Sequence, residues 1–248
     1  MKTYKEILEL LQLLKLKGIA GSLDELIGEA EAQKYSYLSL LRTLLQTEVA
    51  YRAERRFQRN MSAAHFPVPK NIESFEFGRV KGITKGQIAQ LLDFRWLDNH
   101  ENVLFFGPPG LGKTHLSISL GMKAVEQGYT VCFEKIINLI KLLKVQEIQR
   151  SAGFRVNRIL RSDLLIIDEI GYTPIDRKEA NLFFNLVSEL YEKKSIVITS
   201  NKGFESWAEM MGDSVMTTAL LDRLLHHARV FTLDGESYRI DKNKKEEK

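Results

Sequence analysis

Residues 102–121, NVLFFGPPGLGKTHLSISLG, constrain the fold of this chain more than any other stretch. The apolar run at 103–106 has the length and composition of a buried strand, and a helical pattern follows at about 113–127. Between them, residues 107–114 match G-x-x-x-x-G-K-[ST]. A strand, a glycine-rich loop and a helix in this order surround an anion with backbone N–H groups, so the stretch predicts a phosphate site in an α/β fold.

Each residue type in such a loop has its own task. Glycines let the backbone approach a phosphate closely, Lys113 reaches the β- and γ-phosphates, and the Thr114 hydroxyl binds Mg²⁺. The loop therefore predicts ATP and Mg²⁺ as ligands. The residues expected around the nucleotide are Gly107, Pro108, Pro109, Gly110, Leu111, Gly112, Lys113, Thr114 and His115.

Polar residues end two further strand-like runs, LLIIDE and ITSN. The carboxyl ends of strands are where α/β sheets bind ligands. Asp168 is expected to hold Mg²⁺ through its water shell. Glu169 is expected to polarise the attacking water, which a hydrolase requires and a simple kinase does not. Asn201 is suited to orienting water near the γ-phosphate.

Strand-like and helical patterns alternate through most of the chain, which predicts an α/β domain with a buried parallel sheet. The first 65 residues read as helices instead, with Gly18 and Gly21 as a break and Ser22 as the cap of the next helix. Prolines at 67 and 69 end that region. The predicted divisions are a helical domain at 1–65, an ATPase domain at 66–240 and a disordered charged tail at 241–248.

Composition excludes several classes of protein. The chain has 248 residues and one cysteine, Cys132, which excludes an internal disulfide and a cysteine-cluster metal site. No run approaches the ~20 apolar residues that span a bilayer. We therefore expect a cytoplasmic protein without a membrane partner. Its net charge of +4 is mild, so the distribution of charge matters more than the total.

Basic residues gather in two places. Residues 135–161 carry one acid, Glu147, and two helices are expected there with a break near 151–153. The basic residues predicted to contact DNA phosphates are Lys135, Lys141, Lys144, Arg150, Arg155, Arg158 and Arg161. A second group, Arg52, Arg55 and Arg59, shares one helix face and suits duplex phosphates or an acidic protein surface equally well.

Together, GPPGLGKTH, LLIIDEIGYTP, ITSN, GDSVMTTALLDRLLHHA and GESYR resemble the IstB-like transposition helper ATPases. These belong to the initiator branch of the AAA+ superfamily, beside the DnaC helicase loaders and DnaA. The resemblance covers residues 70–240 closely. It implies a five-stranded sheet of order 5-1-4-3-2, a first sensor at Asn201, an arginine finger at Arg223 and a second sensor-like residue at Arg239. Only about fifteen residues follow the last strand, too few for the C-terminal helical lid of other AAA+ proteins.

The resemblance implies a homo-oligomer with ATP sites between subunits. Such an assembly would bind duplex DNA without strong sequence preference, recruit or stimulate a transposase and deform the target DNA. The alternatives are a DnaC-type helicase loader that prefers single-stranded DNA, a small-molecule kinase and a scaffold that binds ATP without hydrolysing it. His226 and His227 point about 100° apart on an ideal helix, so we expect surface or packing roles for them rather than a shared metal ion.

Overall fold

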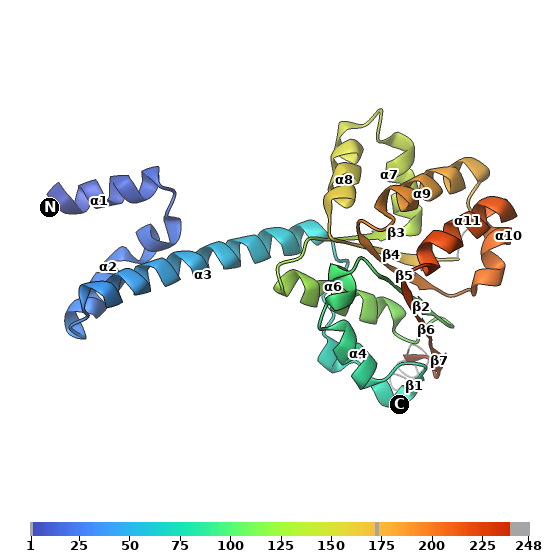
Figure 1. Cartoon of the computed structure of the whole chain (residues 1–248), viewed down its shortest axis with the longest axis horizontal. Coiled ribbons are helices and arrows are strands. Elements are labelled where there is room, and N and C mark those ends of the chain that lie inside the picture. The colour runs from blue at the N-terminus through green and yellow to red at the C-terminus, as the bar shows by residue number, and fades with distance from the viewer. Residues whose placement is uncertain (1, 172–173, 239–248) are drawn as a thin grey trace, which may run out of the picture. The chain divides into compact units, whose positions relative to one another are not determined.

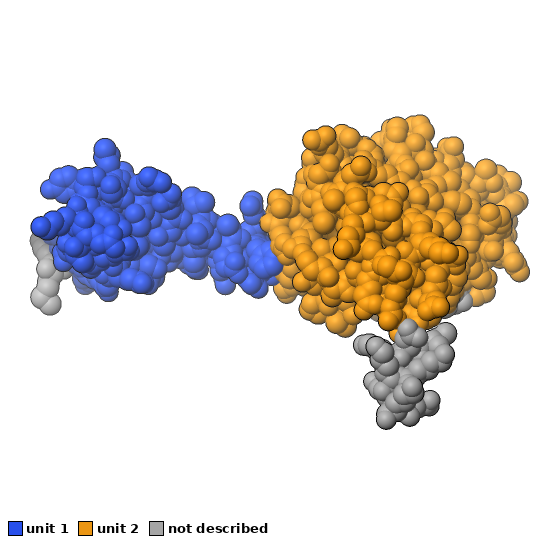
Figure 2. All heavy atoms as spheres, turned by 90° about the horizontal axis from the view of Figure 1, so that it is seen from below, with its two compact units in different colours: residues 1–59 blue, residues 60–248 orange. Residues whose placement is uncertain are grey.

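The computed structural model describes residues 2–171 and 174–238. The chain forms two compact units, residues 1–59 and 60–248, which Figure 2 colours separately. The division falls inside a long helix, before the prolines where the sequence places the boundary. No helix in the described ranges is long and apolar enough to cross a membrane.

The N-terminal unit contains α1 (Lys2–Leu13), α2 (Lys17–Ala32) and most of α3 (Tyr37–Ala64). The predicted break at Gly18 and Gly21 is wrong, because both glycines lie inside α2. Gly18 is there for close packing: a Cβ at this position would lie 2.6 Å from the Cβ of Tyr51 on α3. Its N–H donates to the buried carboxylate of Glu48 at 2.8 Å.

Glu48 also accepts a hydrogen bond from Arg52 at 2.7 Å. Burial disfavours the charged carboxylate, but Arg52 and the N–H groups of Gly18 and Ile19 outweigh it and hold the pKa of Glu48 below its ordinary value. The hydrogen bonds from Gly18 and Ile19 join α2 to Glu48 on α3, whereas the ion pair between Glu48 and Arg52 lies within α3. Arg52 therefore helps to keep Glu48 charged at this junction between the helices.

A five-stranded parallel sheet organises the C-terminal unit (Figure 1). Its strands are β2 (Asn102–Phe106), β3 (Val131–Lys135), β4 (Leu164–Ile170), β5 (Ser195–Ser200) and β6 (Ala228–Thr232). The order across the sheet is β3-β4-β5-β2-β6, which is the predicted 5-1-4-3-2 order read from the opposite edge. A separate antiparallel pair joins β1 (Val80–Lys81) to β7 (Asp234–Gly235).

Helices cover both faces of the sheet. Successive strand residues point to opposite faces, and the strands are apolar along most of their length, so each face must be covered. On one face, Leu104, Leu165 and Ile196 join a core with α7 to α11. On the other face, Ile166 meets Gly121 of α6. The remaining helices are α4 (Lys85–Leu91), α5 (Arg95–Asp98), α6 (Lys113–Glu126), α7 (Ile136–Val145), α8 (Arg150–Arg161), α9 (Arg177–Leu190), α10 (Trp207–Met211) and α11 (Ser214–Leu225), with short 3₁₀ turns at Ile72–Ser74, Phe77–Arg79 and Phe204–Ser206.

The basic segment between β3 and β4 forms two helices, as expected, but the predicted position of the break is wrong. Residues 146–149 separate α7 from α8, and residues 151–153 lie inside α8. Gly153 allows the start of α8 to pass the end of α7, because a Cβ there would lie 2.9 Å from the carbonyl oxygen of Gln146. The glycine marks a close approach between helices rather than a helix end.

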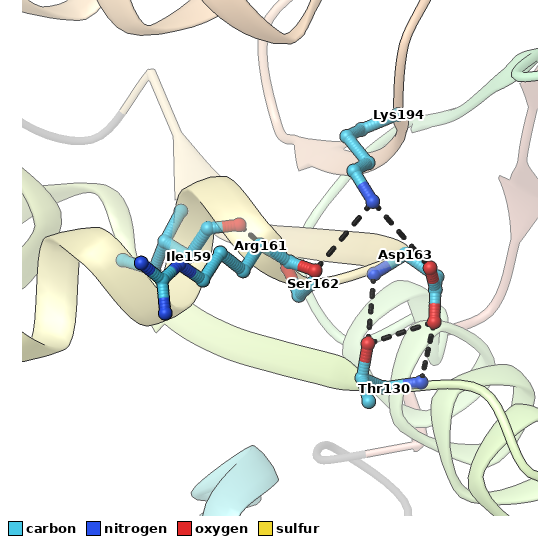
Figure 3. Close-up of polar contacts among 6 residues, drawn as sticks. All are labelled: Thr130, Ile159, Arg161, Ser162, Asp163 and Lys194. Carbon is cyan, nitrogen blue, oxygen red and sulfur yellow. Dashed lines mark hydrogen bonds and ion pairs between the residues drawn. The ribbon is translucent and has the colours of Figure 1, made fainter.

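Asp163 joins the amino ends of three neighbouring strands (Figure 3). Its carboxylate accepts hydrogen bonds from the N–H of Thr130 at 2.9 Å and from the Thr130 hydroxyl at 2.7 Å, and Lys194 lies 3.5 Å away. Burial disfavours the charged form, but these donors outweigh it and hold the pKa of Asp163 below its ordinary value. Thr130 precedes β3 and Lys194 precedes β5, so Asp163 aligns the starts of β3, β4 and β5.

Replacing Asp163 with asparagine is expected to lower the free energy of unfolding by about 1–2 kcal/mol, because the amide loses the charge and one acceptor oxygen. The native pKa is lowered, so the carboxylate's contribution is complete above its unfolded pKa of about 4 and is lost as the pH falls through the native value. Chemical denaturation at neutral and acidic pH measures both effects. Glu189→Gln, at an exposed position of α9, is the control and should change stability by less than about 0.5 kcal/mol. Equal stability of the two variants at neutral pH would contradict the role of Asp163.

Candidate functional site

The strand–loop–helix expected at residues 102–121 is formed by β2, a loop and α6. Gly107 has φ +136°, and a Cβ there would lie 2.1 Å from the carbonyl oxygen of Leu233, so only glycine fits. Gly112, with φ +83°, caps the N-terminus of α6. The ammonium of Lys113 donates to the carbonyl oxygens of Gly107 and Pro108 at 2.6 and 2.7 Å. The loop thus folds around the lysine, with the amino end of α6 behind it.

Asp168 lies at the carboxyl end of β4, next to this loop. Its Oδ1 accepts hydrogen bonds from the hydroxyl of Thr114 at 2.8 Å and from the hydroxyl of Thr199 at 2.6 Å. Its Oδ2 is buried and has no hydrogen-bond partner among the described residues. Burial raises the pKa of Asp168 above its ordinary value, and the two hydroxyls only partly offset this effect. A buried carboxylate oxygen left without a donor is where a cation or its water shell fits.

Glu169 follows at an irregular point of the sheet. The register between β4 and β5 shifts between Ile167 and Ile170, and Glu169 has φ +66°, a conformation unusual for a residue with a side chain. The N–H of Glu169 donates to the Thr199 hydroxyl at 3.0 Å, which holds this backbone in place. Its carboxylate lies 2.8 Å from the ammonium of Lys135. Such strain is tolerated where surrounding contacts fix it, and it is common at functional sites.

These groups converge on one cavity of about 620 Å³. Asn201 is in its wall, and the side-chain oxygen of Asn201 is buried without a described partner. The volume suits a nucleotide-sized ligand. The lining residues are Pro67, Lys70, Ser74, Phe75, Glu76, Pro109, Gly110, Gly112, Lys113, Thr114, His115, Lys135, Asp168, Glu169, Thr199, Ser200, Asn201 and Tyr238.

Magnesium fits the inner end of this cavity. The Thr114 hydroxyl and the free Oδ2 of Asp168 supply oxygen ligands or acceptors for the ion's water molecules, and oxygen is what Mg²⁺ prefers. Asn201 supplies a further neutral oxygen in the same wall. The donor atoms named here are all oxygens, which favours a hard cation.

Sequence reasoning missed Thr199, Phe75 and Tyr238. Thr199 lies two residues before Asn201 and bonds both acidic residues, and its only sequence signal was its place in the ITSN strand end. The Thr199 side chain is buried in the sheet, beside Asp168 on the neighbouring strand. Phe75 and Tyr238 lie in the cavity wall with ring centroids 6.3 Å apart, although 163 positions separate them in the chain. No local pattern connects such distant residues.

The chain after β6 packs against the phosphate loop. The N–H of Tyr238 donates to the carbonyl of Gly110 at 3.1 Å, and its hydroxyl donates to the carbonyl of Glu76 at 2.6 Å. The segment that follows β6 therefore closes one side of the cavity. Arg239, the expected second sensor, lies outside the described residues, as does the predicted tail at 241–248.

Arg223 is not in the lining of this cavity. It lies on α11, where its guanidinium stacks 4.7 Å from the ring centroid of Phe184 and donates to the carbonyl of Ala219 at 2.9 Å. His115, by contrast, is in the cavity wall, where a ring nitrogen lies 2.8 Å from the carbonyl oxygen of Asn71. The structure thus brings every described nucleotide-site candidate except Arg223 to the loop or its cavity.

The residues of segment 135–161 that are predicted to contact DNA fall into three groups: one buried, two in ion pairs and four exposed. Arg155 is mostly buried: it pairs with Glu134 at 2.7 Å and donates to the carbonyls of Ala63 and Phe133. Its expected phosphate contact is a wrong interpretation, because the guanidinium fastens α8 to β3. Lys135 and Lys144 form ion pairs with Glu169 and Glu179. The side chains of Lys141, Arg150, Arg158 and Arg161 are exposed.

The N-terminal unit has its own basic surface. Its cations line a hollow of about 350 Å³ together with the ring of Tyr51. Arg52 is one of them and keeps its ion pair with Glu48. The cations of this hollow are Lys17, Arg52, Arg55, Arg56 and Arg59.

Comparison with known proteins identifies a family of ATP-binding proteins. A model of the IstB-like ATP binding protein family matches residues 9–246. The chain is 39% identical over 240 residues to the insertion sequence IS21 putative ATP-binding protein of Pseudomonas aeruginosa, covering 97% of this chain and 91% of that one. It is also 39% identical over 220 residues to the IS5376 putative ATP-binding protein of Geobacillus stearothermophilus, covering 88% of each.

Solved structures share the fold at low sequence identity. DnaI matches with a TM-score of 0.56 and 14% identity, covering 66% of this chain and 91% of that one. The DnaC helicase loader matches with a TM-score of 0.51 and 18% identity, covering 71% and 99%. These likenesses confirm the AAA+ architecture and carry no conclusion about function. The chain belongs to the IstB-like ATP-binding proteins of insertion sequences.

Proposed function

We propose that this protein hydrolyses ATP and assembles with Mg·ATP on duplex DNA as a helper of transposition. The observation that carries the proposal is the convergence of Thr114, Asp168, Glu169 and Asn201 on one cavity beside the phosphate loop. A protein that only binds ATP requires the phosphate loop and a cation site. Hydrolysis also requires groups that activate and orient the attacking water, and the Glu169 carboxylate and the Asn201 amide are suited to these tasks.

Each cavity residue then has a defined task. Lys113 and the loop N–H groups hold the phosphates, and a Mg²⁺ ion at this site would supply neutralisation of the phosphate charge. Thr114 and Asp168 would hold that ion. Glu169 accepts a proton from the attacking water, and Asn201 orients that water molecule.

The arginine finger acts between subunits in this proposal. Arg223 packs on its own α9 and is not in the lining of its own cavity, which is consistent with a finger that each chain supplies to the ATP of its neighbour. A guanidinium at the γ-phosphate stabilises the charge of the transition state. ATP binding and assembly would then be coupled, because each ATP site is complete only between two chains.

DNA would bind along α7 and α8. Lys141, Arg150, Arg158 and Arg161 are exposed there, and contacts from such cations to phosphates give affinity without base identity. Arg52, Arg55 and Arg59 would add phosphate contacts from the N-terminal unit. The expected form is therefore an oligomer on duplex DNA in the cytoplasm, which recruits a transposase and presents deformed target DNA.

The relatives' names support the context of this proposal. The 39% identical proteins are named as ATP-binding proteins of insertion sequences, and a transposase is the enzyme that such an element needs to move. The alternative that the sequence leaves open is a helicase loader that prefers single-stranded DNA. Preference for duplex over single-stranded DNA separates the two.

A charge-removal variant tests the DNA surface. Replacing Lys141, Arg158 and Arg161 with alanine is expected to weaken duplex binding and to lower the slope of log affinity against log salt by about three. The control replaces three exposed cations of the same unit, Lys85, Lys178 and Lys193, with alanine. Fluorescence anisotropy over a range of salt concentrations measures both. Equal slopes for the two variants would place the DNA elsewhere.

A further inference from the structure

Two histidines and a glutamate form a cluster at the end of α11, away from the cavity residues. The expectation that His226 and His227 diverge is wrong, because α11 ends at Leu225 and the chain turns there into β6. Their ring centroids lie 4.1 Å apart. Glu192, in the turn after α9, places Oε1 3.6 Å from Nδ1 of His226 and 3.8 Å from Nε2 of His227.

The backbone that carries these side chains is held in position. Asn102, buried at the start of β2, donates from its amide nitrogen to the carbonyl of Leu224 at 3.0 Å and accepts from the N–H of Ile196 at 2.9 Å. Its own N–H donates to the carbonyl of His227 at 2.7 Å. One buried residue therefore links the end of α11 to the strand that follows the Glu192 turn. The backbone at His227 is thus joined through Asn102 to the backbone of Ile196, four residues after Glu192.

We propose that Glu192, His226 and His227 bind a divalent transition-metal ion. The three candidate ligand atoms lie within 4.8 Å of one another, and a shift of each by less than about 1 Å would bring them to the ~2.0–2.2 Å bond lengths of Zn²⁺. Two imidazoles and one carboxylate suit zinc and its neighbours rather than Mg²⁺, which prefers oxygen. The side chains are about half exposed, so water completes the coordination.

One hydrogen bond changes when the ion binds. The Tyr191 hydroxyl lies 2.7 Å from Nδ1 of His226, and the ion takes its place there. Glu192 itself has φ +56°, a backbone conformation that is unusual for a residue with a side chain. The bound ion would fasten the C-terminal end of α11, the helix of Arg223, to the turn that follows α9. The binding itself is independent of ATP and DNA.

Isothermal titration of the untagged full chain with ZnCl₂, without nucleotide, tests the site. The expected result is one ion per chain, with affinity at least about tenfold weaker in Glu192→Gln and in His227→Asn. His100→Asn is the matched control, since His100 is exposed and outside the cluster, and it should bind as the wild type does. Unchanged melting temperatures of all variants in metal-free buffer show that the comparison concerns binding. Equal affinity of the cluster variants and the wild type, or a tenfold loss in His100→Asn, would overturn the proposal.

Discussion

Replacing Glu169 with glutamine is expected to lower the rate of ATP hydrolysis by about two to four orders of magnitude and to leave ATP affinity nearly unchanged. The amide has the shape of the carboxylate but cannot accept a proton from water. ATP affinity should persist because the groups that hold the phosphates, Lys113 and the loop, are untouched. The loss should appear in kcat rather than in the binding constant.

Phosphate release and titration with a fluorescent ATP analogue measure the two quantities separately. Glu189→Gln is the control, because it makes the same chemical change at an exposed position outside the cavity. Turnover within about threefold of the wild type in Glu169→Gln would remove Glu169 from the proposed chemistry. Loss of ATP binding instead would mean that Glu169 supports the shape of the site.

Replacing Arg223 with alanine is expected to reduce turnover by about three orders of magnitude or more, because the transition state loses a positive charge at the γ-phosphate. Binding of ATP to the isolated chain should persist, since Arg223 is not in the cavity lining. Arg223→Lys keeps the charge but loses the planar fork, so it should recover little activity. Normal turnover in Arg223→Ala would contradict a finger supplied by a neighbouring subunit.

A mixture of the two variants tests whether the site is shared. In a mixed assembly, an Arg223→Ala chain can supply Glu169 while its Glu169→Gln neighbour supplies Arg223. Random mixing in equal amounts makes about a quarter of the interfaces complete. Turnover should therefore rise far above that of either variant alone. No recovery on mixing would place Glu169 and Arg223 in the same chain's site.

The nucleotide-binding half of the fold follows from local patterns. A strand, a phosphate loop of eight residues and a helix follow one another within 20 positions, so each supports the interpretation of the others. The apolar strands of a parallel sheet are also easily recognised. The polar ends of β4 and β5 were predictable for the same reason. The carboxyl ends of parallel strands meet at one edge of the sheet, so Asp168, Glu169 and Asn201 had to lie near the loop.

Contacts between segments that are distant in the sequence could not be predicted from such local patterns. Gly18 and Gly153 were read as helix breaks, whereas each allows another backbone or side chain to approach closely. Arg155 was counted as a surface cation, but its side chain is mostly buried and bonds to Glu134 and to two backbone carbonyls. The histidine pair was interpreted as part of an ideal helix, but that helix ends at Leu225, before both histidines. Each error comes from a tertiary partner that the local sequence does not contain.

The most direct test of ATP-dependent assembly is fluorescence anisotropy of a labelled long duplex titrated with protein in Mg·ATP and in Mg·ADP, with single-stranded DNA as competitor. We predict steep binding in Mg·ATP that single strands do not displace, and much weaker binding in Mg·ADP. Equal binding in the two nucleotides, or ready displacement by single-stranded DNA, would contradict assembly on duplex DNA driven by ATP.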